Sequence, residues 1–207
     1  MKVIGLLLAA LALSAAVLAS MTFVNESNDA LRESNHWQHL ESEKLSLGSL
    51  YAQGKLDRTG KRRLAAVYRQ DGELDKSVAL LRALWIEPAS VEDFNKDAHE
   101  LASLYSEMGA FDSALESYRS ILAFNKKRLS FGDAQIGRDL SNLAVCQYLK
   151  ACCQSEPLAR RKELQKSLSL YLDARRFIVS ADNLTAESRK QMLEVIDDNM
   201  KLARLDL

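Results

Sequence analysis

Residues 64–74 read LAAVYRQDGEL, and residues 101–111 read LASLYSEMGAF. The Leu-Ala pair, the Tyr, the Gly and the closing apolar residue recur in the same order, 37 positions further along the chain. The offset continues through residues 77–84, whose small and apolar positions recur in residues 114–121. Self-similarity at a fixed period of this length is the signature of a repeat architecture. We therefore expect the chain to fold as an array of similar units.

The first unit is predicted to be a pair of helices. Apolar residues spaced three or four positions apart predict helices at about 59–71 and 74–86. Thr59 is a candidate N-cap for the first helix, and Asp71-Gly72 supplies the turn between the two. Pro88 is expected to stop the second helix. The unit is therefore a helical hairpin.

The second unit repeats this design. Residues 90–93 read SVED, a capping-box pattern that predicts the start of a helix running to Met108. Gly109 is expected to turn the chain, and a second helix is predicted at about 111–126. The two units should form consecutive helical hairpins of similar length.

The third unit is less regular. Its Leu143-Ala144 pair follows the preceding one at an offset of 42 residues, and about 11 residues are inserted around 152–162. The insertion is expected to form a loop or a lengthened helix that projects from one face of the stack. A last helix at about 184–204 is predicted to be a polar-backed cap. Before the repeats, a polar helix is expected from roughly residue 27 to Gln53.

These residues resemble the tetratricopeptide repeat (TPR), a helical hairpin of about 34 residues with Leu, a small residue, Tyr, Gly and Ala at set positions. The resemblance covers roughly residues 59–180, and the stretch 138–148 is similar to the longer repeats of kinesin-light-chain type. It implies an all-α fold, a right-handed α-solenoid of about three hairpins closed by a C-terminal capping helix. Ser77 and Ser167 depart from the family's usual Ala.

The resemblance also implies a concave groove lined by the first helix of each hairpin. Carried onto this chain, the lining would include Ala66 and Val145 and the following candidate partner-binding residues: Arg62, Arg69, Gln70, Lys96, His99, Ser103, Ser106, Arg138, Ser141 and Tyr148. Five of these side chains are cations or potential cations, which would suit an acidic or C-terminal peptide. The alternative is that they form an ordinary solvated helix face.

The chain begins with Lys2 and then an uncharged, apolar stretch from residue 3 to 24. Two interpretations stay open. The stretch is either a signal peptide cleaved before Ser20 or a transmembrane anchor of 22 residues. Met21 stands where a bacterial lipoprotein would need the acylated Cys, so lipidation is rejected. The expected domains are a signal or anchor at 1–24, a polar helical linker or N-terminal cap at 25–58 and a repeat domain at 59–207, placed outside the cytoplasm.

The chain is neutral, with 28 basic and 28 acidic residues and no basic block. This argues against nucleic acid as a partner, because phosphate binding needs clustered Lys and Arg. No phosphate-binding loop or hydrolase motif is present, so neither a cofactor nor an enzymatic activity is predicted. Asn25 and Asn183 begin glycosylation sequons.

Three cysteines and a histidine pair are the candidate sites of chemistry in the sequence. Cys146, Cys152 and Cys153 are expected to be buried small hydrophobes rather than disulfide partners. His36 and His39 have a spacing that could hold zinc, but only Glu43 lies near enough to join them, so no metal site is predicted.

The sequence predicts a non-enzymatic interaction scaffold, anchored at or exported across a membrane, that assists assembly of an envelope or membrane complex. One alternative is a structural accessory subunit of a larger membrane complex, packed permanently through the other side of the stack. A third hypothesis, from a different class, is a thiol-active enzyme using Cys152 or Cys153.

Overall fold

The computed structural model describes residues 35–130 and 132–207. Contacts divide the chain into two compact units, residues 1–60 and 61–207. In the first unit, residues 35–52 are helical, and Gly54 follows with a φ of 68°. Gly tolerates this left-handed conformation because it has no Cβ, so Gly54 stops the polar helix as predicted. The signal or anchor expected at residues 1–24 lies outside the described residues.

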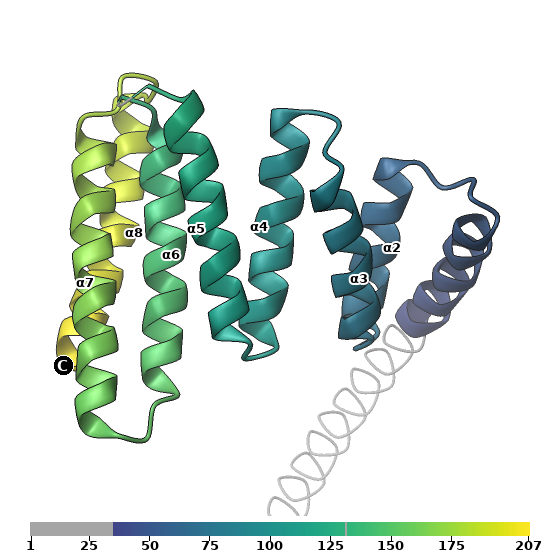
Figure 1. Ribbon diagram of the computed structural model, residues 1–207, viewed down its shortest axis with the longest axis horizontal. Coiled ribbons are helices and arrows are strands. Elements are labelled where there is room, and N and C mark those ends of the chain that lie inside the picture. Colours follow the sequence, from purple (N-terminus) through teal and green to yellow (C-terminus); the bar gives the residue numbers. More distant parts are fainter. Residues whose placement is uncertain (1–34, 131) are drawn as a thin grey trace, which may run out of the picture. The chain divides into compact units, whose positions relative to one another are not determined.

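Seven helices follow in the described part of the chain after residue 57, and no strand occurs in it. They are α2 (Arg58–Gln70), α3 (Leu74–Ile86), α4 (Val91–Glu107), α5 (Phe111–Arg128), α6 (Ala134–Cys152), α7 (Pro157–Val179) and α8 (Ala186–Leu205). Figure 1 shows them as successive antiparallel pairs followed by a single last helix. The predicted all-α stack of three hairpins with a C-terminal helix is confirmed. None of the described helices is both long enough and apolar enough to cross a bilayer.

For the helices predicted at 59–71, 74–86, 90–108, 111–126 and 184–204, the ends agree with the observed ones to within two residues. The start predicted near residue 27 for the polar helix lies outside the described residues. Ser90 caps α4 by accepting a hydrogen bond from the Asp93 backbone N–H at 3.0 Å, as the capping pattern indicated. The prediction for Thr59 was wrong, because this residue lies inside α2. The Asp57 carboxylate instead accepts a hydrogen bond from the Gly60 N–H at 2.7 Å, as an N-cap does.

The turns of the first two hairpins have the same geometry. Gly72 and Gly109 adopt φ values of 78° and 72°. After each glycine, the next backbone N–H returns to the carbonyl of the motif Tyr, from Glu73 to Tyr68 and from Ala110 to Tyr105, each at 2.8 Å. These six-to-one bonds are those of a Schellman C-cap. The repeat at 37 residues is therefore a repeat of backbone conformation.

Two serines join the helices within hairpins. The Ser77 hydroxyl donates to the Ala65 carbonyl at 2.7 Å, and the Ser167 hydroxyl donates to the Ala144 carbonyl at 2.8 Å. Both serines are buried. They stand where the TPR pattern has Ala, so the departure from the family pattern adds one buried bond in each of these hairpins.

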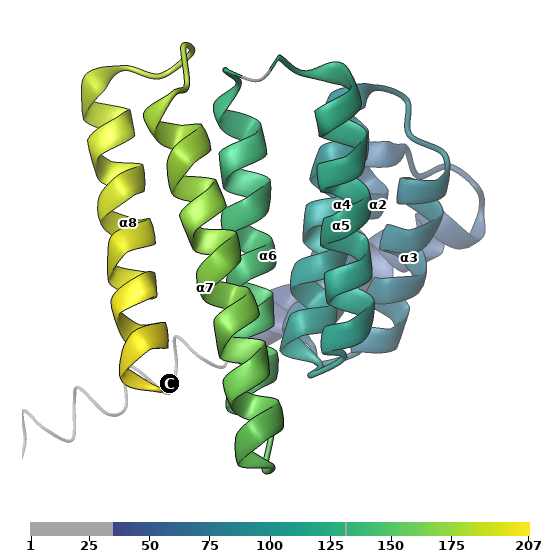
Figure 2. The same ribbon diagram turned by 60° about the vertical axis from the view of Figure 1, so that its left-hand side comes forward.

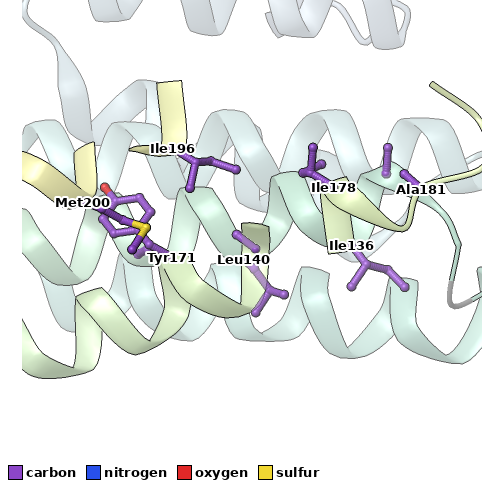
Figure 3. Packing of buried hydrophobic residues seen from close by; sticks show 10 residues of the cluster. Ile136, Leu140, Tyr171, Ile178, Ala181, Ile196 and Met200 are labelled. Atoms are coloured by element: carbon purple, nitrogen blue, oxygen red, sulfur yellow. The ribbon is translucent and has the colours of Figure 1, made fainter. Parts of the chain in front are cut away.

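The core runs through the stack as a series of shared clusters. One cluster joins α4 and α5 to Leu143 and Cys146 of α6. The next joins α6 and α7 to Ile196 and Met200 of α8, and includes the buried Tyr171. Figure 3 shows these side chains meeting between the helices. Each hairpin thus buries its apolar face against its neighbour, as expected for a stacked repeat.

The inserted residues lengthen helices instead of forming a long loop. Helices α6 and α7 have 19 and 23 residues, compared with 17 and 18 for α4 and α5. Figure 2 shows the joined ends of α6 and α7 extending beyond the neighbouring helices. Glu156 caps the added turn of α7 by accepting from the N–H groups of Leu158 and Ala159. The lengthened-helix alternative is therefore the correct one.

Helix α8 covers the end of the third hairpin only in part as predicted. Ile196 and Met200 are buried, and Asp197 and Asp198 are exposed. However, Val195 and Leu202 are also more than half exposed. The outer side of this cap is thus mixed, polar and apolar, rather than polar throughout.

Candidate interaction face

The first helices α2, α4 and α6 and the last helix α8 are separated by three successive pockets. The pocket beside α2 and α4 has a volume of about 340 Å³, the one between α4 and α6 about 300 Å³, and the one between α6 and α8 about 320 Å³. Predicted lining residues occur in all three, namely Arg62 and Arg69 in the first, Ser103 and Ser106 in the second, and Arg138 and Ser141 in the third. We call this row of pockets the first-helix face.

Arg62 is engaged in an ion pair between hairpins. Its Nε lies 2.5 Å from Oδ1 of Asp97, and its Nη2 lies 2.5 Å from Oδ1 of Asp93, both on α4. The Asp97 side chain is fully buried and that of Arg62 is only 14% exposed. Hydrogen bonds to Asp97 raise the pKa of the Arg62 guanidinium above its ordinary value, against the effect of burial. Arg62 therefore joins α2 to α4 rather than offering a free charge.

Arg69 makes a second link between the same helices. Its guanidinium pairs with the Glu107 carboxylate, with Nε 2.7 Å from Oε2, and also donates to the Ser103 hydroxyl at 3.3 Å. This pair lies closer to solvent than the pair made by Arg62. Surface pairs of this kind contribute up to about 1 kcal/mol, so Arg69 is less firmly committed to the fold.

His99 occupies the position equivalent to Arg62, one repeat later. Its Nε2 lies 3.2 Å from Oδ1 of Asp139 on α6, and Asp139 stands 42 positions after Asp97. The buried Asp139 carboxylate also accepts from the Asn125 amide at 2.7 Å and the Gln135 amide at 2.8 Å. A contact between a basic side chain and a buried aspartate thus recurs at both junctions between hairpins, with His in place of Arg at the second.

Ser106 and Tyr148 are also engaged in contacts within the protein. The Ser106 hydroxyl donates to the Ala102 carbonyl at 3.0 Å and lies 3.6 Å from the Cys146 sulfur. The Tyr148 hydroxyl donates to Oδ2 of Asp206 at 2.6 Å, which raises the pKa of this phenol above its ordinary value. Tyr148 therefore binds the C-terminal end of α8.

The structure revises the interpretation of the five cations. Arg62 and Arg69 form ion pairs with carboxylates of the next hairpin, and the His99 ring contacts Asp139, so all three side chains are already engaged within the protein. Lys96 and Arg138 are exposed on the same face, as is the amide of Gln70. The argument that five cations favour an acidic partner was therefore wrong for three of them. Sequence reasoning missed the buried acceptors Asp97 and Asp139.

The cysteines divide into two classes. Cys146 is buried, as expected, and burial raises the pKa of its thiol. Cys152 and Cys153 are exposed, so the expectation that they fill the core was wrong. Both lie at the end of α6, where the inserted residues carry the helix away from its neighbours. Within residues 35–130 and 132–207, no group of three or more His, Cys, Asp or Glu side chains could hold a metal ion.

No protein-family model matches the chain, and no curated protein matches it. Among solved structures, it is similar to the TPR-like repeats of a putative kinesin light chain from Podosopora anserina. That structure is 16% identical with a TM-score of 0.48, over 81% of this chain and 91% of that one. BtubC (BKLC) from P. vanneervenii is also 16% identical with a TM-score of 0.40, over 71% and 63% of the two chains. At this identity and superposition we draw nothing further from either, and the TPR-like fold stands on the hairpins themselves.

Proposed function

We propose that this protein is a protein–protein interaction scaffold that binds its partner along the first-helix face. The observation that supports the proposal is the row of three pockets, lined by residues of α2, α3 and α4, of α4, α5 and α6, and of α6 and α8. Their walls are helices already held by buried ion pairs and shared core clusters. A preformed surface loses little conformational entropy on binding, which favours capture of an extended segment or a helix.

The partner's chemistry follows from what the face leaves exposed. Lys96 and Arg138 are available to carboxylates, and the pocket between α6 and α8 adds the apolar side chains of Met192, Val195 and Ile196. The proposed partner is therefore a protein segment with both apolar and polar side chains. Acidic residues would add to its binding only near Lys96 and Arg138.

We further propose that residues 3–24 place the repeats at a membrane, as an anchor or as a cleaved signal, and that the scaffold assists assembly of an envelope or membrane complex. The support is the uncharged apolar stretch at the start of the sequence. Intact-mass measurement of protein from its native host separates the two forms. A mass beginning at Ser20 means a cleaved signal, and a full-length mass in the detergent extract means an anchor.

Site-specific photo-crosslinking tests the binding face. A photoreactive amino acid at Ser103 or Ser141 should give a crosslinked partner band in the native host. The same residue at Ala123, exposed on α5, is the matched control and should not. Crosslinking from Ala123 and not from the first-helix face would reject the proposal in favour of a structural subunit bound through its second helices.

Charge reversal tests the role of the exposed cations. Lys96→Glu with Arg138→Glu should weaken partner capture about tenfold or more, because both side chains are exposed on first helices and Arg138 lines the pocket between α6 and α8. Reversing Arg62 is a poor test, because it would place a third carboxylate against Asp93 and Asp97 and unfold the junction. Unchanged capture by the double variant, with crosslinking from Ser141 retained, would show that apolar contacts suffice.

A further inference from the structure

The solvent side of α7 carries an unusual stripe. Among its exposed positions, 158, 162, 165, 169, 172, 176 and 179 follow one another at steps of three or four residues, and position 161 lies beside them. This spacing puts them on one face of the helix, opposite the buried positions 164, 167, 171, 174 and 178. The helix has 23 residues, so the face is about 34 Å long.

The stripe combines large apolar side chains with cations. Leu158 is 75% exposed, Leu172 44% and Val179 50%. Between them lie Arg161, Lys162 and Arg176, all exposed. Such a mixture is costly to leave in water unless the apolar side chains have another environment at some stage.

The charge of α7 sets it apart in a neutral chain. The helix carries six cations, Arg160, Arg161, Lys162, Lys166, Arg175 and Arg176, against Glu163 and Asp173. Some are paired, since Arg160 lies 3.6 Å from Asp206, Arg175 3.0 Å from Asp197, Lys166 2.8 Å from Glu163 and Arg176 3.4 Å from Asp173. Arg161 and Lys162 contact no carboxylate in the described part of the chain, and both belong to the insertion that lengthened this hairpin.

We propose that the outer face of α7 docks on an anionic phospholipid bilayer surface. Cations near such a surface are attracted to its headgroups, and Leu158, Leu172 and Val179 can enter the interface while the long Arg and Lys stems keep their charges among the phosphates. An exposed helix face suits the surface of a bilayer better than a protein segment that needs a pocket. This surface is distinct from the first-helix face and independent of the partner proposed for it.

The test places a fluorophore at Leu172→Cys in the full chain, with Cys152→Ser and Cys153→Ser to leave one exposed thiol. The probe is a lipid vesicle of equal parts phosphatidylglycerol and phosphatidylcholine that carries a headgroup nitroxide quencher. We expect quenching of the fluorophore at position 172 on these anionic vesicles. The quenching should be at least about threefold weaker on pure phosphatidylcholine vesicles, and molar salt should weaken it on the anionic ones. A fluorophore at Val195→Cys on α8 is the matched position and should stay unquenched.

Two variants complete the test. Arg161→Glu with Arg176→Glu should abolish the difference between anionic and neutral vesicles, whereas Lys190→Glu with Arg204→Glu, the same charge change on α8, should preserve it. Equal quenching at positions 172 and 195, or quenching that ignores headgroup charge, would overturn the proposal. Absence of quenching at position 172 would also overturn the proposal. Sedimentation of the full chain, with and without an acidic protein, would then show whether a second copy or a protein partner covers this face of α7.

Discussion

Buried hydroxyl groups set the contact between the two helices of a hairpin at Ser77 and Ser167. Ser77→Ala or Ser167→Ala removes one buried hydrogen bond and leaves the acceptor carbonyl in its own helix. Each change should lower the free energy of unfolding by about 1 kcal/mol, as measured by urea denaturation. Ser169→Ala, exposed on α7, is the control and should stay within about 0.5 kcal/mol of the parent. Equal losses at all three positions would contradict a role for the buried bonds.

Arg62 contacts two carboxylates whose environments differ. Asp97→Ala leaves a nearly buried guanidinium without its main partner and should lower the free energy of unfolding by about 3 kcal/mol. Asp93→Ala removes a carboxylate that is partly exposed and should cost about 1 kcal/mol. Urea denaturation of both variants provides the comparison. A larger loss at Asp93 would mean that Asp93, not Asp97, is the main partner of the Arg62 charge.

The sequence located the cations but not their partners. Arg62, Arg69 and His99 were correctly placed on first helices, and their bonding was missed because each acceptor lies 35 to 40 residues away. Local spacing shows only which face a side chain shares with its neighbours. A usable signal was present, because Asp97 and Asp139 repeat at the same offset as the Leu-Ala motif and sit beside the apolar stripe. A recurring charge at a core-facing position indicates a paired, structural residue.

At the scale of helices, α6 and α7 approach each other closely at Gly137. A Cβ there would lie 2.6 Å from Ile178 Cδ1 and 3.2 Å from the Ala174 carbonyl oxygen. Gly137→Ala should lower the free energy of unfolding by about 1–3 kcal/mol through overpacking, despite the higher helix propensity of Ala. The loss should shrink in an Ile178→Val background, where the clashing Cδ1 is absent. A double-mutant cycle by urea denaturation measures this coupling, and additive losses would count against the close approach.

Helix positions were the most predictable part of the structure. Gly72 and Gly109 marked the turns because only Gly adopts their positive φ without strain, and the apolar spacing between them fixed α3 and α4. The sequence did not predict the form of the insertion, because a repeat offset gives the number of inserted residues but does not distinguish a loop from added helical turns. Glu156 followed by Pro157 favours a helix, because the Glu156 carboxylate caps the first turn of α7 and Pro is well suited to the first position of a helix.

At the scale of the repeat unit, residues 61–207, each hairpin should stabilise only the hairpins that pack directly against it. Ending the chain at Thr185 removes α8 and exposes the cluster around Tyr171 that Ile196 and Met200 cover. Hydrogen exchange should then accelerate about tenfold or more in α6 and α7 and much less in α3 and α4. Uniform acceleration would instead mean that the stack unfolds as one cooperative body.

The contacts of Arg62 with Asp97 and of His99 with Asp139 repeat from one hairpin to the next, as the bonds between monomers repeat along a polymer. Helix α2 begins this series because it carries the basic side chain of Arg62. Helix α4 continues it because it carries both the acceptor Asp97 and the next basic side chain, His99. The next donor position falls on Ser141, which has no charge and shares its pocket with the apolar Ile196. A further hairpin with a buried aspartate would find no cation there. The series of contacts therefore ends at Ser141, at the same place where α8 covers the last hairpin.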